Sequence, residues 1–188
     1  MSNEKTPVEE RRAIQLVSLD ARDLVDDILS GTRDFSYRNL HFPESVGSYV
    51  NSETGSINQY VEQNIEDLRK RPIGFQSSIL VNLYAPGIKL PYTNFTLADL
   101  TDAYLGDAYL QEAKFVGANV ERTEFSDADL KSADFRGAQQ LDLAYGLDKA
   151  KYDGVIILPK QVELVKRLGL DVGRLDVRDY KREEGASS

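Results

Sequence analysis

Cysteine and tryptophan are absent from this chain of 188 residues, and histidine and methionine occur once each. Without cysteine the chain can form neither a disulfide nor a thiolate metal site. No apolar run approaches the roughly 18 residues that a membrane-spanning helix needs. The first stretch, MSNEKTPVEERR, is too polar for a signal peptide. We therefore expect a soluble, cytoplasmic protein that makes no membrane contact.

Positive charge is also scarce. The chain has 23 lysines and arginines against 31 aspartates and glutamates, which gives a formal net charge of −8 at pH 7. Proteins that bind nucleic acid neutralise phosphates with lysine and arginine. We therefore expect no direct nucleic-acid contact. The length is sufficient for one domain with a full core.

The residue types that carry catalysis are sparse as well. His41 is the single histidine, and no Gly-x-Ser-x-Gly nucleophile elbow or glycine-rich phosphate loop accompanies it. One histidine without cysteine is a poor donor set for a metal ion. We expect His41 to be a surface or turn residue, and we predict no catalytic residue, no cofactor and no metal. The chain is therefore not expected to be an enzyme.

What the sequence does contain is a repeat of five residues. A period of five fits neither a helix nor a strand, so it predicts a stacked coil in which each turn buries its inner face against the next. The register continues to Gln140, and a small residue precedes most of the later centres by two positions. The apolar centres are Phe75, Leu80, Ala85, Leu90, Phe95, Leu100, Leu105, Leu110, Phe115, Val120, Phe125, Leu130 and Phe135.

The sequences ADL at residues 98–100 and ADF at residues 133–135 resemble the A-(D/N)-L/F-x-x pattern of the pentapeptide-repeat family. Consecutive units with centres from 95 to 135 follow this pattern. The resemblance implies an all-β solenoid, a right-handed quadrilateral β-helix of about three to four coils with four pentapeptides per turn. The centre and the small residue of each unit would both point inward.

A coil of twenty residues sorts the centres into four columns, one of which contains only phenylalanine from residue 75 to residue 135. Phe35 falls on the same column. The third column would end on Tyr145 and the fourth on Ala150. Gln140 and Asp148 would occupy interior positions, so we expect the coil to lose its form between residues 140 and 150.

We expect one domain, residues 1–188, in which helices close both ends of the coil. An N-terminal helical cap is predicted over 6–30, and an early repeat-like segment with a helical insertion over 31–72. The β-helix is predicted over 73–145, the C-terminal cap over 146–178 and a flexible tail over 179–188.

Capping and stop residues predict where the helices of these segments begin and end. Thr6, Pro7 and Glu9 predict a helix start, and Gly31 predicts the stop. Residues 41–54 are expected to be a loop. Ser56 begins a predicted capping box with the glutamine at 59, on a helix that ends before residue 72. A C-terminal helix is predicted over 159–170.

Two outward surfaces could bind a partner. Tyr84 and Tyr104 lie twenty residues apart and should stack on one face, and Tyr109 takes the equivalent place on the next face, with Tyr92 and Lys89 near that corner. Clustered tyrosines are typical of interfaces. We therefore predict an unidentified protein partner or self-association at Tyr84, Tyr104, Tyr109 and Tyr92. The alternative is that the rings pack beneath the N-terminal helices.

The second surface is acidic, with nine carboxylates against four basic residues between 95 and 140. Negative charge of this kind commonly serves solubility alone. Some pentapeptide-repeat proteins bind DNA gyrase, a type II topoisomerase, by presenting an acidic rod in place of DNA, so the resemblance implies this alternative role. The present repeat is short for such a mimic, and Arg122, Lys131 and Arg136 interrupt its acidic surface.

Overall fold

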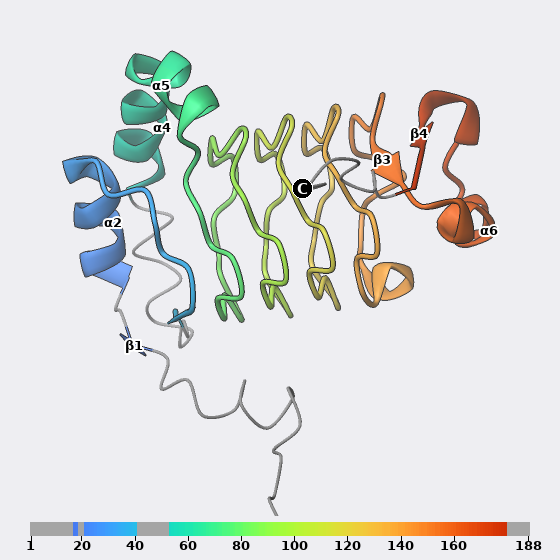
Figure 1. Cartoon of the computed structure of the whole chain (residues 1–188), viewed down its shortest axis with the longest axis horizontal. Coiled ribbons are helices and arrows are strands. Elements are labelled where there is room, and N and C mark those ends of the chain that lie inside the picture. Colours follow the sequence, from blue (N-terminus) through green and yellow to red (C-terminus); the bar gives the residue numbers. More distant parts are fainter. Residues whose placement is uncertain (1–16, 19–20, 41–52, 180–188) are drawn as a thin grey trace, which may run out of the picture.

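The computed structural model describes residues 17–18, 21–40 and 53–179. Within these residues a stack of coils forms the middle of the molecule, with short helices at either end of the stack (Figure 1). The helices and strands are β1 (Val17–Ser18), α2 (Ala21–Ser30), β2 (Arg38–Asn39), α4 (Thr54–Gln63), α5 (Ile65–Lys70), η1 (Leu141–Leu143), β3 (Ile156–Ile157), η2 (Pro159–Gln161), α6 (Val162–Arg167), η3 (Val172–Arg174) and β4 (Asp176–Val177).

Isolated parallel bridges hold the coils together. From Gly74 to Gln139 each bridge joins a residue to the one twenty positions later. The Phe95 amide donates to the Lys114 carbonyl over 2.8 Å, and the Lys114 amide donates back to the Thr93 carbonyl over 2.9 Å. Four bridged positions recur in every twenty residues, which confirms the predicted coil length. The bridges are single because each side of the coil is only one pentapeptide long.

The corners between the sides require a left-handed backbone. The second residue after each centre has a positive φ, and glycine, asparagine and aspartate fill many of these positions because they tolerate that conformation. The same conformation is imposed on Leu97 with φ 59° and on Arg122 with φ 54°. The stacked neighbours therefore override local preference at these two corners.

The predicted centres point inward. The phenylalanine column stacks with ring centroids 5.5 Å apart between Phe75 and Phe95, 5.1 Å between Phe95 and Phe115, and 4.6 Å between Phe115 and Phe135. Phe35 extends the column, 5.3 Å from Phe75. Each fully buried ring contributes roughly 1.5–3 kcal/mol from burial alone. The column therefore provides a continuous core through the coils.

The early repeat-like segment stacks on the coils. Asp34 bridges Gly74 and Asn39 bridges Ile79, so the chain returns to the same two columns after forty residues instead of twenty. The extra residues include α4 and α5, which lie beside the N-terminal coils in Figure 1. Residues 41–52, most of the predicted loop, lie outside the described residues, as does the predicted helix start at residues 6–9.

Three predictions about the N-terminal helices are wrong. Val17, expected to be helical, belongs to β1, which pairs in parallel with β2. The capping box at Ser56 does not form, because α4 already begins at Thr54 and the Ser56 hydroxyl donates to the Glu53 carboxylate over 3.1 Å. The expected single helix is also divided at Asn64, between α4 and α5. The predicted stop of α2 at residue 31 is confirmed.

The regular five-residue register is lost after residue 140, where η1 begins, but the stacking of the coils continues beyond residue 150. The bridges continue from Glu124 to Tyr145, from Asp129 to Lys151 and from Asp134 to Ile156, because η1 and the following turn absorb the extra residues. Gln140 is exposed, and the next residue, Leu141, is buried in its place.

The same shift corrects the third and fourth columns. Tyr145 is 52% exposed and points outward, and Asp148 is exposed rather than interior. Ala150 is buried, and by the bridge of Asp129 to Lys151 the column position after Leu130 is taken by Tyr152, which is buried. The predicted C-terminal helix is divided into η2 and α6 and ends at 167. Residues 180–188 lie outside the described part.

Candidate functional site

Tyr84 and Tyr104 lie on one side of the coil, as predicted. The two residues form a parallel bridge, and their ring centroids are 5.0 Å apart with the planes tilted by 37°. Tyr84 is 42% exposed and Tyr104 is 37% exposed. The Tyr104 ring covers the turn at Gly106, where an added Cβ would lie 2.9 Å from the ring. The absence of a side chain at Gly106 thus lets this ring lie flat on the coil.

Sequence reasoning missed the third tyrosine of this face. Tyr145 follows Glu124 on the same bridged column as Tyr84 and Tyr104. A strict spacing of five placed it in the core. The longer turn at 141–143, which shifts the register by one residue, has no clear sequence signal. We call Tyr84, Tyr104 and Tyr145 the tyrosine face.

Tyr109 and Tyr92 belong to a separate surface, on the next side of the coil and against the inserted helices. Lys89 and Tyr109 form a bridge, and the Lys89 Nζ lies 5.2 Å from the centre of the Tyr109 ring. The Arg69 guanidinium from α5 lies 5.9 Å from the centre of the Tyr92 ring, which is half-buried. The four predicted tyrosines therefore form two pairs on adjacent faces, and the second pair borders helices.

The side chain of Asn58 joins α4 to this second surface. Its Oδ1 accepts the Lys89 amide over 2.6 Å, and its Nδ2 donates to the Gly87 carbonyl over 2.9 Å. In the next coil the equivalent amide, that of Tyr109, donates to the Ile88 carbonyl. Asn58 thus replaces a backbone carbonyl that a preceding coil would supply. Nothing in the sequence pattern distinguishes it from other polar residues on the helix.

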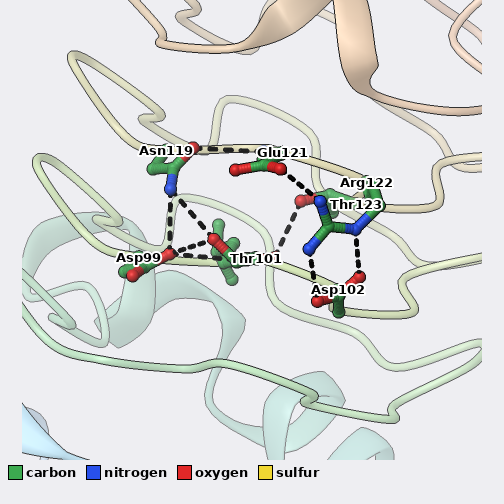
Figure 2. Close-up of polar contacts among 8 residues, drawn as sticks. Asp99, Thr101, Asp102, Asn119, Glu121, Arg122 and Thr123 are labelled. Carbon is green, nitrogen blue, oxygen red and sulfur yellow. Dashed lines mark hydrogen bonds and ion pairs between the residues drawn. The ribbon is translucent and has the colours of Figure 1, made fainter.

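Part of the acidic surface is paired within the protein. Figure 2 shows Arg122 donating from Nε and Nη2 to Asp102, over 2.6 and 2.8 Å, and pairing with Glu121. This hydrogen-bonded pair lowers the pKa of Asp102 below its usual value and raises that of Arg122. Asp99 accepts from the Thr101 hydroxyl over 2.5 Å and from the Asn119 amide over 3.2 Å.

The described residues contain no group of three or more histidine, cysteine, aspartate or glutamate side chains that could hold a metal ion. His41 lies outside them. Over the same part of the chain no helix has the length and apolar character needed to cross a membrane.

Comparison with known proteins identifies the repeat. A family model described as "Pentapeptide repeats" matches residues 103–139 with eight copies. No curated protein matches the chain.

Several solved structures are similar to this chain. The pentapeptide repeat protein alr5209 from Nostoc Pcc 7120 is 22% identical, with 63% of this chain and 95% of that chain covered and a TM-score of 0.47. Rfr23 from the cyanobacterium Cyanothece 51142 is 24% identical, with 44% and 61% covered and a TM-score of 0.32.

QnrB1, a plasmid-mediated fluoroquinolone resistance protein, is 17% identical, with 53% of this chain and 64% of that chain covered and a TM-score of 0.18. All three TM-scores are below 0.5, so the matched repeat and its twenty-residue bridges carry the assignment. Residues 103–139 therefore consist of pentapeptide repeats.

Proposed function

We propose that this protein is a non-catalytic protein-binding module built on a right-handed quadrilateral β-helix. In this proposal α2, α4 and α5 cover the N-terminal end of the coils, and α6 covers the C-terminal end. Their buried residues, which include Leu24, Ile57 and Val165, join the core of the coils. Covered ends support a monomeric scaffold, since open coil edges would pair with other chains.

The exposure of the tyrosine face carries this proposal. Tyr84, Tyr104 and Tyr145 keep between 37% and 52% of their surface exposed, although bridges hold their backbone in place, on both sides at Tyr104 and on one side at the other two. Tyrosine supplies a large contact area and few rotatable bonds, so the stacked pair Tyr84 and Tyr104, with Tyr145 beyond Glu124 on the same column, loses little conformational entropy on binding. Exposed tyrosines that cluster in this way are typical of a protein-binding surface.

The double variant Tyr84→Ser/Tyr104→Ser tests the proposal. We expect it to keep the circular dichroism spectrum of the wild type and to lose the proteins that the wild type captures from its native cell, as measured by mass spectrometry. Sedimentation velocity tests self-association in parallel. The control is Leu97→Asn, which removes an apolar side chain of 50% exposure at a corner away from the tyrosine face. Asparagine tolerates the positive φ of 59° at this residue. Identical capture and sedimentation by all three proteins would refute the proposal.

Mimicry of DNA toward a type II topoisomerase is the second candidate, favoured by the acidic excess of the repeat. It requires carboxylates that are free to meet a basic partner. Three of the nine, Asp102, Glu121 and Asp134, are already paired with Arg122 or Arg136. A supercoiling assay with purified gyrase separates the candidates, because a mimic inhibits the enzyme and a module for another partner does not.

A further inference from the structure

Two hollows lie next to each other where the inserted helices meet the coil, and they share Lys89 and Tyr109. The first has a volume of about 420 Å³ and is also lined by Val61, Glu62, Ile65, Pro91, Tyr92 and Gln111. The second has a volume of about 400 Å³ and is also lined by Asn58, Gly87, Asp107, Asp127, Asp129 and Lys151.

Lys89 and Tyr109 line both hollows and form the ridge between them. Contacts with α4 and with the next coil hold this ridge in place. The Lys89 ammonium pairs with Glu62 of α4 and lies over the Tyr109 ring, while its backbone amide is bound by Asn58. Tyr109 is bridged in turn to Asp129 in the next coil. A ridge fixed in this way keeps both hollows formed before a partner arrives, which reduces the entropy lost on binding.

The two hollows differ in chemistry. The first is formed mainly by apolar groups, from Val61 and Ile65 on the helices and Pro91 and Tyr92 on the coil, and fits an apolar side chain. The second collects carboxylates instead.

In the second hollow Asp107 and Asp127 lie at equivalent corners of successive coils, with Asp129 nearby, and none of the three has an ion pair among the described residues. Lys89 is engaged by Glu62, which leaves Lys151 as the one other lysine that lines this hollow. A surplus of carboxylates beside a tyrosine ring favours a cation, through ion pairing and contact with the ring face.

We propose that these hollows together bind an extended segment of another protein, in which an apolar side chain lies close in sequence to an arginine or lysine. The inference rests on the proposed protein-binding function and names the chemistry of the partner. The apolar side chain enters the first hollow, and the cation reaches the carboxylates of the second. Charge complementarity selects this occupant, since the chain as a whole also carries a net charge of −8.

Selection of random displayed dodecapeptides on the full-length protein tests this proposal. We expect the selected peptides to combine leucine, isoleucine or phenylalanine with arginine or lysine. Synthetic copies should bind Asp107→Asn/Asp127→Asn and Tyr109→Ser about tenfold more weakly by fluorescence anisotropy. Asparagine suits the positive φ of 58° and 59° at residues 107 and 127, so the backbone is retained. Asp142→Asn removes a charge outside both hollows and should bind as the wild type does.

The tyrosine-face variant Tyr84→Ser/Tyr104→Ser separates this inference from the proposed function. Two results would overturn the inference and leave the proposed function standing. One is the selection of acidic peptides. The other is the selection of peptides that bind Asp107→Asn/Asp127→Asn and Tyr109→Ser as tightly as the wild type and do not bind the tyrosine-face variant. Failure to select any peptide would also overturn the inference. The proposed function is tested separately by the capture of cellular partners, which supports it if the tyrosine-face variant loses them and refutes it if the variant keeps them. Binding that weakens with added salt supports the cationic contact.

Discussion

Gln161 should be the residue whose amide matters most to the stability of the C-terminal end. Its side chain is 6% exposed. Oε1 accepts the Leu158 amide over 2.9 Å and the Gly137 amide over 3.1 Å, and Nε2 donates to the Phe135 carbonyl over 2.9 Å. In the preceding coil the Gly117 amide donates to the Arg136 carbonyl. The amide of Gln161 therefore provides, at the last coil, a partner that a further coil would provide.

Replacement of Gln161 by Met keeps most of the side-chain volume and removes all three hydrogen bonds. The Leu158 and Gly137 amides then lose their partner, whereas the Phe135 carbonyl still accepts the Ala138 amide over 3.1 Å. Each buried polar group left without a partner costs about 1–3 kcal/mol. Because the bond to the Gly137 amide is only partly buried and water can replace it in part, we expect a total loss of about 2–4 kcal/mol in the free energy of unfolding. That is a large part of the stability of about 5–15 kcal/mol typical of a domain.

Urea unfolding followed by circular dichroism measures this loss for the wild type, Gln161→Met and Gln161→Ala. Both variants lack the hydrogen bonds, and the Ala variant also leaves a cavity. The difference between their free energies of unfolding therefore measures the contribution of packing. Lys160→Ala, at the exposed neighbouring residue of η2, is the control and should change the free energy by less than about 0.5 kcal/mol. A Gln161→Met protein as stable as the wild type would refute the reasoning that the amide substitutes for a coil.

Three further changes test the fold and the site. Phe115→Ala should cost about 3–5 kcal/mol in urea unfolding, because the ring is fully buried between stacked phenylalanines; a loss below about 1 kcal/mol would contradict a rigid column. Asn58→Ala should accelerate hydrogen exchange of the Lys89 amide about tenfold or more, and unchanged exchange would show that α4 does not close this edge. Arg122→Ala should destabilise the protein slightly at neutral pH. Because the pKa of Asp102 is lowered in the folded state, the difference in stability from the wild type should shrink as the pH falls below about 3.8 and through the lowered value, and a difference independent of pH would contradict the ion pair.

The functional surfaces show where sequence reasoning reached its limit. The stacking of Tyr84 on Tyr104 followed from their spacing of twenty, because both occupy the outward position of a unit and the coil repeats every twenty residues. The hollows beside Tyr109 could not be predicted, since they form only where α4 and α5 approach the coil. Helical periodicity predicted that these helices form, but it did not predict which side of the coil they pack against.

The sequence alone determined the coil, its length of twenty residues and its phenylalanine column. Each unit has the same arrangement of a small residue, an inward centre and a left-handed corner. The period of the sequence therefore predicts the architecture of the coils. The tertiary structure decided how the coil begins and ends. Asn58 and Gln161 supply partners to open edges, and η1 absorbs the shift that carries the coil past Gln140. These features depend on which backbone amides remain unpaired at the edges after the coils have stacked. Those amides lie far from Asn58 and Gln161 in the sequence, so only the tertiary structure shows the contacts.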